Sequence, residues 1–152
     1  MALIVRSSDV HAAGVFTTSP IRKGSRVVEY TGPRLTKDKG DEIYDQKDIT
    51  YLFALDDGKV IDGHGIAMFI NHCCNPNCET DEEDDDRIWI YAIKDIEAGA
   101  ELTYDYCLFD GEGEAPCHCG AKKCRGSLYS NEELRRRKKE ERKAQAKKAK
   151  AL

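Results

Sequence analysis

The densest chemistry in the sequence is a group of cysteines near the C-terminal end. The segment Cys117-His-Cys119-Gly-Ala-Lys-Lys-Cys124 places three thiols on one short loop, with Gly120 allowing the backbone to turn. Thiolates are strong Zn²⁺ ligands, and a structural zinc site uses four ligands arranged tetrahedrally. Because the loop has too little apolar content to order itself, the spacing predicts a zinc site rather than free thiols. A fourth ligand must come from elsewhere, and the spacing leaves these candidates open: Cys73, Cys74, Cys78, Cys107 and His118.

A second group of polar residues is Asn71-His-Cys-Cys-Asn-Pro-Asn77. Asparagine and proline are common in ordinary turns, so this segment alone fits a polar turn. The apolar residues Met68-Phe-Ile70 stand directly before it, which indicates that the turn starts from the core. Asn71 and His72 are therefore expected at a semi-buried rim, where polar groups need partners. That position favours a binding site.

A third candidate is Glu101-Leu-Thr-Tyr-Asp-Tyr106, which carries two tyrosines at alternate positions. Alternate residues of a strand face the same way, so Tyr104 and Tyr106 are expected on one face. Tyrosines beside apolar strands usually pack in the core or at its rim. Taken alone, this segment predicts packing, and a functional interpretation depends on the other motifs.

Short strands separated by turn residues must position these segments. Asp57-Gly58 is a hairpin signal between two of the strands. Thr36 is a suitable N-cap for a short helix over residues 37–44, although Gly40 weakens that helix. The expected strands cover residues 3–5, 27–30, 51–55, 59–61, 88–93 and 101–106.

Composition limits the class of protein. The chain has 152 residues, 40% hydrophobic and 34% charged, which is the size of one compact domain. No stretch approaches the ~20 apolar residues that span a bilayer. The N-terminus lacks the features of a signal peptide, so an intracellular location and no membrane partner are expected. Seven cysteines, an odd number without a sign of export, make a disulfide framework the weaker interpretation.

The net charge of −4 divides unevenly along the chain. Residues 131–152 carry ten Lys and Arg against four Glu, a net +6, which leaves −10 on residues 1–130. An acidic body attracts basic peptides, whereas a basic tail attracts nucleic acid. The tail has no apolar stripe and favours a helix by propensity alone, so it is expected to be helical or disordered. The six consecutive acids at 81–86 fit a solvated loop, with attraction of a basic substrate as the alternative.

In their order along the chain, these segments resemble the SET-domain protein lysine methyltransferases. Asn71-His-x-Cys74-x-Pro-Asn77 is similar to the family's N-H-S-C-x-P-N motif, with Cys73 where serine is common. Glu101–Tyr106 resembles the E-L-x-[F/Y]-D-Y motif, and Cys117–Gly126 resembles the post-SET C-x-C-x4-C-R-G segment. Four further segments fall in the family's order: Gly14-Val-Phe16, Glu29-Tyr-x-Gly32, Tyr51-Leu-Phe53 and Ile61-Asp62.

The resemblance implies a mainly β SET fold of several small β-sheets and short helices, with a pseudoknot-like threading of its C-terminal segment and a post-SET zinc loop. The implied divisions are a SET domain over 1–109, a post-SET zinc-binding segment over 110–130 and a basic tail over 131–152. In the family the cysteine of the N-H-x-C segment joins the three later ones as a ligand. The implied zinc ligands are therefore Cys74, Cys117, Cys119 and Cys124, which leaves Cys73, Cys78 and Cys107 as free thiols.

The resemblance also implies transfer of a methyl group from S-adenosylmethionine to a lysine amine, which must be deprotonated to act as a nucleophile. Tyr106 would be the catalytic tyrosine. Tyr104 occupies the family's Phe/Tyr switch position, where a tyrosine favours monomethylation, and Tyr51 would line the channel for cofactor and lysine. The implied cofactor-binding residues are Ala13, Gly14, Val15, Tyr51, Asn71, His72, Tyr106 and Leu128.

Two positions depart from the family pattern. The segment Ala12-Ala13-Gly14 lacks the first glycine of the common G-x-G cofactor turn, and alanine fits there if φ is negative. Met68 stands where arginine is frequent, which removes one polar contact.

The expected substrate is a basic protein segment, such as a histone tail or a similar lysine-rich sequence. The location would be the nucleus, at chromatin, in a eukaryote, and the cytoplasm or a host cell for a bacterial or viral protein. Two alternatives stay open. One is a non-catalytic SET-like module that binds a basic peptide. The other is a nucleic-acid-binding protein acting through residues 131–152, although that tail has no aromatic residues for stacking.

Overall fold

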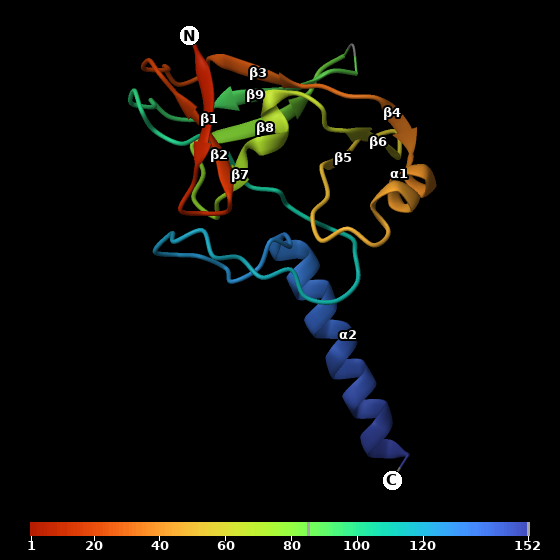
Figure 1. Cartoon of the computed structure of the whole chain (residues 1–152). Coiled ribbons are helices and arrows are strands. Elements are labelled where there is room, and N and C mark those ends of the chain that lie inside the picture. The colour runs from red at the N-terminus through yellow and green to blue at the C-terminus, as the bar shows by residue number, and fades with distance from the viewer. Residues whose placement is uncertain (85, 152) are drawn as a thin grey trace.

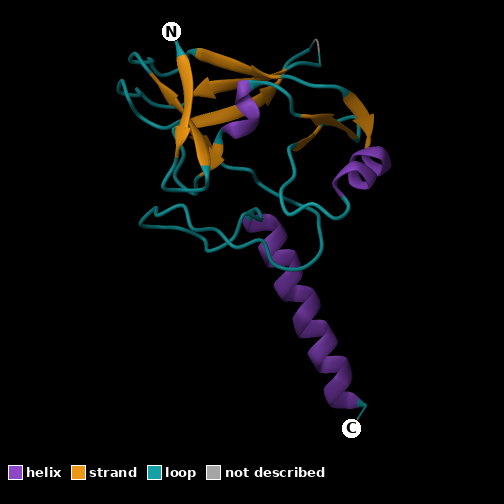
Figure 2. Cartoon of the chain, viewed as in Figure 1, coloured by secondary structure: helices purple, strands orange, loops and turns teal. Residues whose placement is uncertain are grey.

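Short β-strands make up the body of the protein, and a long helix projects from it (Figures 1 and 2). The computed structural model describes residues 1–84 and 86–151. In chain order the strands are β1 (Leu3–Ser7), β2 (Ala13–Thr17), β3 (Arg26–Tyr30), β4 (Arg34–Thr36), β5 (Leu52–Ala54), β6 (Lys59–Asp62), β7 (Asn71–His72), β8 (Cys78–Glu82), β9 (Ile88–Ala92) and β10 (Thr103–Tyr104). The helices are α1 (Lys37–Tyr44), a 3-10 turn η1 (Ile66–Phe69) and α2 (Asn131–Lys150).

The strands form several small sheets, which confirms the mainly β architecture. β1 pairs with β2, β9 lies between β3 and β8, and β6 lies between β4 and β5, all antiparallel. β7 and β10 form a separate parallel pair, with Thr103 opposite Asn71 and Tyr104 opposite His72. That pair joins two of the segments expected to carry chemistry.

Alternation along β9 shows how the sequence builds the core. Ile88, Ile90 and Ala92 are buried, whereas Trp89 and Tyr91 between them are half-buried on the other face. This is the period of two that a strand with one face on the core requires. Burying one large aliphatic side chain contributes roughly 1.5–3 kcal/mol before the opposing entropy. The other fully buried core residues include Val15, Ile70, Cys78 and Leu102.

The predicted helix and hairpin are confirmed. The Thr36 hydroxyl accepts a hydrogen bond from the Lys39 backbone amide at 3.3 Å and caps α1. Gly40 is buried on the sheet side of α1, and a Cβ there would lie 2.8 Å from a Val60 methyl group. The glycine that weakens the helix by propensity is therefore the residue that lets α1 pack closely on β6. Between β5 and β6, Gly58 turns the chain at φ +81°.

The acidic run is not a loop throughout. Its first residues, Asp81 and Glu82, belong to β8, and Asp85 lies outside the described residues. The Glu82 carboxylate accepts a hydrogen bond from the Asp56 backbone amide at 2.9 Å, and Glu83 pairs with Arg26 at 2.5 Å. Because each of these two carboxylates already has a partner within the fold, both contribute to the structure around β8.

The tail adopts the helical alternative. The Ser130 hydroxyl caps α2 by accepting a hydrogen bond from the Glu133 backbone amide at 3.1 Å. Two acids in the first turn and three lysines in the last turn complement the helix dipole. Among the residues that the model describes, no helix combines the length and the apolar character needed to cross a membrane.

Candidate active site and metal centre

The parallel pair β7–β10 brings the second and third candidate segments together. The Cys73 backbone amide donates to the Tyr104 carbonyl at 3.1 Å. The Asn77 side chain extends this contact, because its amide nitrogen donates to the Glu101 carbonyl at 2.8 Å and its amide oxygen accepts from the Thr103 backbone at 2.9 Å. Asn77 thus substitutes for a strand neighbour beside β10.

Asn71 and His72 are buried, with 7% and 3% of their surface exposed, so the expectation of a semi-buried rim is wrong. Polar side chains can be buried where their hydrogen bonds are made inside the protein. The Asn71 amide nitrogen donates to the Glu101 carboxylate at 2.8 Å and to the Ala13 carbonyl at 2.9 Å. The Ser8 hydroxyl donates to the same carboxylate at 2.8 Å. The partners that bury Asn71 therefore come from the segment just before β10 and from the start of β2.

The turn before β2 adopts the conformation that a glycine would favour. Ala12 has φ +31°, so the condition of a negative φ at this position is not met. A side chain in the left-handed region costs on the order of 1–2 kcal/mol. Gly14 is required for a different reason, since a Cβ there would overlap the Glu101 carboxylate. The Val15 side chain is fully buried, so only its backbone could contact a cofactor.

Tyr106 is a half-buried phenol with a fixed hydroxyl. The hydroxyl donates to the Ile70 carbonyl at 2.8 Å, and the ring centroid lies 5.0 Å from that of Tyr104. Burial raises the pKa of Tyr106 to about 12, so this side chain is neutral at physiological pH. The hydroxyl proton is used in the hydrogen bond to the Ile70 carbonyl. The lone pairs of the Tyr106 oxygen can still accept a hydrogen bond.

Tyr104 and Tyr51 lie in the same aromatic region. Tyr104 is 7% exposed and its ring centroid lies 6.5 Å from that of Phe53, and burial raises its pKa well above the ordinary value. Tyr51 is half-buried, and its backbone carbonyl accepts a hydrogen bond from the Tyr30 hydroxyl at 2.6 Å. Tyr30 therefore holds the backbone of a predicted site residue. Sequence reasoning missed this role because an isolated strand tyrosine carries no signal for it.

The strand expected over 101–106 is shorter in the structure, where β10 covers Thr103–Tyr104 alone. Beyond it, the Tyr106 backbone amide donates to Nδ1 of His72 at 3.1 Å instead of to a neighbouring strand, and Cys107 turns the chain at φ +46°. Because Nδ1 accepts, neutral His72 carries its proton on Nε2, which lies 3.3 Å from the Cys74 sulfur. Burial lowers the pKa of His72. His72 thus connects the tyrosine segment to the cysteine cluster.

Four cysteine sulfurs, from Cys74, Cys117, Cys119 and Cys124, lie within 4.8 Å of one another. The Cys74 sulfur is 3.8 Å from that of Cys117 and 3.9 Å from that of Cys124. A tetrahedral Zn²⁺ with Zn–S bonds of ~2.3 Å separates its sulfurs by about 3.8 Å. The donor set and its dimensions therefore fit a zinc ion.

Backbone amides point at the sulfurs of the cluster, as expected for thiolate ligands. The Cys74 amide donates to the Cys119 sulfur at 3.4 Å, the Arg125 amide to the Cys74 sulfur at 3.4 Å and the Gly126 amide to the Cys124 sulfur at 3.3 Å. The structure places the remaining thiols outside the four-sulfur group: Cys73 is half-buried, Cys78 is buried in the core and Cys107 is exposed.

An ion pair that sequence reasoning missed ties the cysteine loop to the tyrosine segment. Arg125 Nη2 donates to Asp105 Oδ1 at 2.8 Å, and the two side chains are 13% and 24% exposed. The same Asp105 oxygen lies 3.6 Å from Nδ1 of His72. Asp105 stands between Tyr104 and Tyr106, and Arg125 directly follows the last cysteine, so their membership in these motifs was the available signal.

Leu128 lies farther along the same C-terminal segment. It is half-buried, its backbone amide donates to the Ala115 carbonyl at 2.8 Å, and its carbonyl accepts from the Leu108 amide at 3.2 Å. These bonds hold Leu128 between the chain that leaves β10 and the cysteine loop. The predicted contact of Leu128 with a cofactor stays a prediction.

Comparison with known proteins adds independent evidence. A family model described as the SET domain matches residues 12–107. The chain is 39% identical to the histone-lysine N-methyltransferase trithorax of Drosophila melanogaster over 131 residues, 80% of this chain and 4% of the relative. It is 41% identical to human histone-lysine N-methyltransferase 2B over 139 residues, 84% of this chain and 5% of the relative. An H3 lysine-4 specific histone-lysine N-methyltransferase of Saccharomyces cerevisiae is 39% identical over 135 residues, 80% of this chain and 12% of the relative. The chain thus spans a small part of each of these relatives.

Proposed function

The chain belongs to the SET-domain family, and on that premise we propose that it is an S-adenosylmethionine-dependent protein lysine N-methyltransferase. The observation that carries the proposal is the position of Tyr106. Its neutral hydroxyl is fixed on the Ile70 carbonyl, beside Tyr104 and next to the buried pair Asn71 and His72. This arrangement suits a reaction that needs orientation and exclusion of water more than a strong acid or base.

The residues around β7 and β10 suit the proposed cofactor. When bound, S-adenosylmethionine supplies a methyl group on a positively charged sulfur, which is a good leaving group. The amino acid and adenine parts are proposed to contact the backbone of residues 13–15 and of β7, where the Ala13 carbonyl also accepts from Asn71. The rings of Tyr51 and Tyr106 offer electron-rich faces and oxygens for a cation. Leu128 is proposed to cover the adenine.

Tyr106 is proposed to act through its oxygen and not as a base. Because the phenol is neutral and its proton is donated to Ile70, its lone pairs can accept from a lysine amine or from a polarised methyl group. A buried aromatic site favours the neutral amine of the substrate lysine over its charged form. The lysine therefore loses its proton to solvent before transfer, and Tyr106 aligns the neutral nitrogen.

Tyr104 is proposed to bias the product toward monomethyl-lysine. Its buried ring packs against Phe53 and Tyr106, which fixes the position of the hydroxyl. A hydroxyl in that place can hydrogen-bond a lysine amine and leaves less room for an amine that already carries methyl groups. The bias toward monomethyl-lysine therefore depends on the Tyr104 hydroxyl oxygen, through the space it fills and the hydrogen bond it can make.

A zinc ion held by Cys74, Cys117, Cys119 and Cys124 is proposed to fasten the C-terminal loop beside β7. The thiolates supply the charge that holds the metal, and His72 and Arg125 contact the Cys74 ligand from the tyrosine side. The ion would have a structural role, because all four protein positions of the site are filled by sulfur.

The proposed substrate is a lysine in a basic, histone-like segment. Residues 1–130 carry a net charge of −10, which attracts such a segment by electrostatic steering. The names of the relatives point to histones, and in the yeast relative to lysine 4 of histone H3. A nuclear location at chromatin follows for a eukaryotic source.

The test is incubation of the zinc-loaded chain with methyl-labelled S-adenosylmethionine, core histones and a panel of other basic proteins. We expect label in a histone, and a Tyr106→Phe variant should lose most of it while binding the cofactor. Cofactor binding without label in any protein would favour the alternative of a non-catalytic peptide-binding module.

A further inference from the structure

Among the residues that the structure describes, the helix α2 is fastened to the body by its first turns. Glu133 is 4% exposed and pairs with Arg136 at 2.6 Å and with Arg137 at 2.7 Å. Arg137 also donates to the carbonyls of Gly111 and Gly113 at 2.8 and 2.9 Å, and its guanidinium stacks 3.7 Å from the ring centroid of Tyr129. These contacts set the direction in which the rest of the helix leaves the body (Figure 1).

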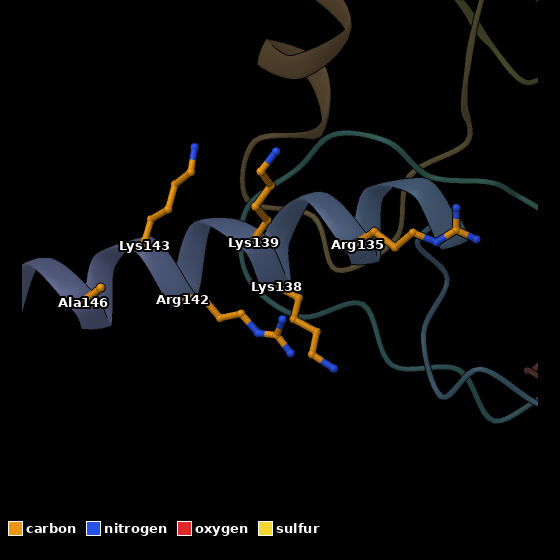
Figure 3. A pocket seen from close by; sticks show the side chains of 6 residues that line it. All are labelled: Arg135, Lys138, Lys139, Arg142, Lys143 and Ala146. Carbon is orange, nitrogen blue, oxygen red and sulfur yellow. The ribbon is translucent and has the colours of Figure 1, made fainter.

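Beyond this anchor the helix presents positive charge to solvent. Residues 138–150 are exposed. We call the surface formed by Arg135, Lys138, Lys139, Arg142 and Lys143 the basic face. Figure 3 shows these side chains with Ala146, the charged ends spreading to both sides of the helix.

The acids of α2 are sorted away from the basic face. At about 100° per residue, its five members fall within less than half of the helix circumference. Glu140 and Glu141 lie outside that arc, and Glu140 is neutralised by Arg136 at 2.7 Å. Glu132 lies on the same side of the helix as the basic face, but it stands in the first turn of α2, before the first member of that face. An even mixture of charges would leave no such surface.

The composition of α2 selects among negatively charged partners. A helix that lies on a membrane needs an apolar face, and every apolar residue of α2 beyond Leu134 is an alanine. A protein partner is usually held by aromatic, apolar or arginine anchors buried in pockets. The basic face has two arginines, but no aromatic or large apolar residue stands among its members. Single-stranded nucleic acid is held by stacking on aromatic side chains, and α2 has none. A duplex presents a regular array of phosphates that requires only positive charge, and its major groove admits an α-helix.

We propose that the basic face of α2 binds duplex nucleic acid through its phosphates, without sequence preference. The −10 charge of residues 1–130 repels a polyanion, and the projection of α2 holds the bound duplex away from that body. This inference goes beyond the proposed methyl transfer and does not depend on it. It gives the chain a second contact, which keeps it near basic proteins that are themselves bound to nucleic acid.

The experiment measures binding of the zinc-loaded full chain to a labelled DNA duplex of mixed sequence between 50 and 200 mM salt, by fluorescence anisotropy. Three variants are compared. Lys139→Gln with Lys143→Gln removes two charges from the basic face. Lys23→Gln with Lys94→Gln removes two exposed charges from the body. Glu141→Lys with Lys143→Glu keeps the net charge and moves one positive charge off the basic face. Circular dichroism verifies that each variant keeps its helix.

We expect the face variant to bind on the order of tenfold or more weakly, with a salt slope smaller in magnitude by about 2. The charge-neutral exchange should also weaken binding, and the body variant should bind as the parent does. Equal loss in the face and body variants would overturn the proposal, because bulk charge would then explain the binding. Absence of duplex binding at 50 mM salt, or tighter binding to vesicles rich in phosphatidylserine, would overturn it as well. Label transfer to a short peptide should be unchanged in the face variant, which separates this proposal from the proposed enzyme activity.

Discussion

The ion pair between Asp105 and Arg125 gives a quantitative test of how the cysteine loop is joined to the tyrosine segment. The perturbation is a double-mutant cycle with Asp105→Asn and Arg125→Met. Removing one partner of a fully buried pair costs about 3–5 kcal/mol, whereas an exposed pair contributes ~0–1 kcal/mol. The Arg125 side chain is 13% exposed and the Asp105 side chain is 24% exposed, so the pair lies between these two cases. We therefore expect a coupling free energy of about 2 kcal/mol.

The structure also predicts which single variant is worse. Among the described residues, Arg125 Nε is buried without a hydrogen-bond partner. Arg125→Met removes this unsatisfied donor together with the ion pair, which recovers part of the ~1–3 kcal/mol that such a group costs. Asp105→Asn leaves the guanidinium in place without its carboxylate. The Asp105→Asn variant should therefore be the less stable of the two.

The assay is urea unfolding of the zinc-loaded chain with linear extrapolation to water. The Lys39–Glu42 pair of α1 is the matched control, because its distance is also 2.8 Å while its side chains are 54% and 71% exposed. Its coupling should be below about 0.5 kcal/mol. A coupling for Asp105 and Arg125 no larger than that of the control would show that this pair does not join the two segments. A less stable Arg125→Met variant would show that the unpaired Arg125 Nε carries no penalty.

Four further predictions follow from single residues. Cys74→Ser should lower bound zinc below one per chain and Cys73→Ser should not, as measured by metal analysis; retention of zinc in Cys74→Ser would assign the fourth ligand elsewhere. Ala12→Gly should raise the free energy of unfolding by up to about 1 kcal/mol, because φ is +31° there and glycine's own entropy offsets part of the relief; a urea melt that shows destabilisation contradicts this. Tyr104→Phe should shift the products toward dimethyl- and trimethyl-lysine, as measured by mass spectrometry; an unchanged distribution of products would contradict the proposed role of Tyr104. The pKa of Tyr106 is raised by burial to about 12 from 10.0, so its contribution to stability is complete below pH 10 and is lost as pH rises toward 12; in urea unfolding at increasing pH, the stability difference between the parent chain and Tyr106→Phe should change only above pH 10, and a change below pH 9 would contradict a neutral Tyr106.

The cluster of four cysteines shows what spacing can and cannot predict. Cys117, Cys119 and Cys124 share one short loop, so their spacing alone indicates a common metal. The fourth sulfur comes from Cys74, 43 residues before Cys117, and its neighbour Cys73 has the same chemistry. The tertiary path of the chain decides between them, and only the resemblance to a family pointed to Cys74 in advance.

Burial was the property that local sequence predicted least well. The turn chemistry of Asn71 and His72 indicated a partly exposed rim, but the parallel pairing of β7 with β10 encloses both side chains. Their partners, among them Glu101 and Ser8, lie far away in the sequence. Strands of alternating apolar residues such as β9, in contrast, were predictable because the period of two is a local property.

Tandem mass spectrometry of histone H3, after incubation with S-adenosylmethionine and the zinc-loaded chain, tests the proposed methylation of lysine. We expect a single methyl group on a lysine side-chain nitrogen, and most of this product should be lost when Tyr106→Phe replaces the parent chain. A histone that stays unmodified, or a methyl group on a residue other than lysine, would contradict it.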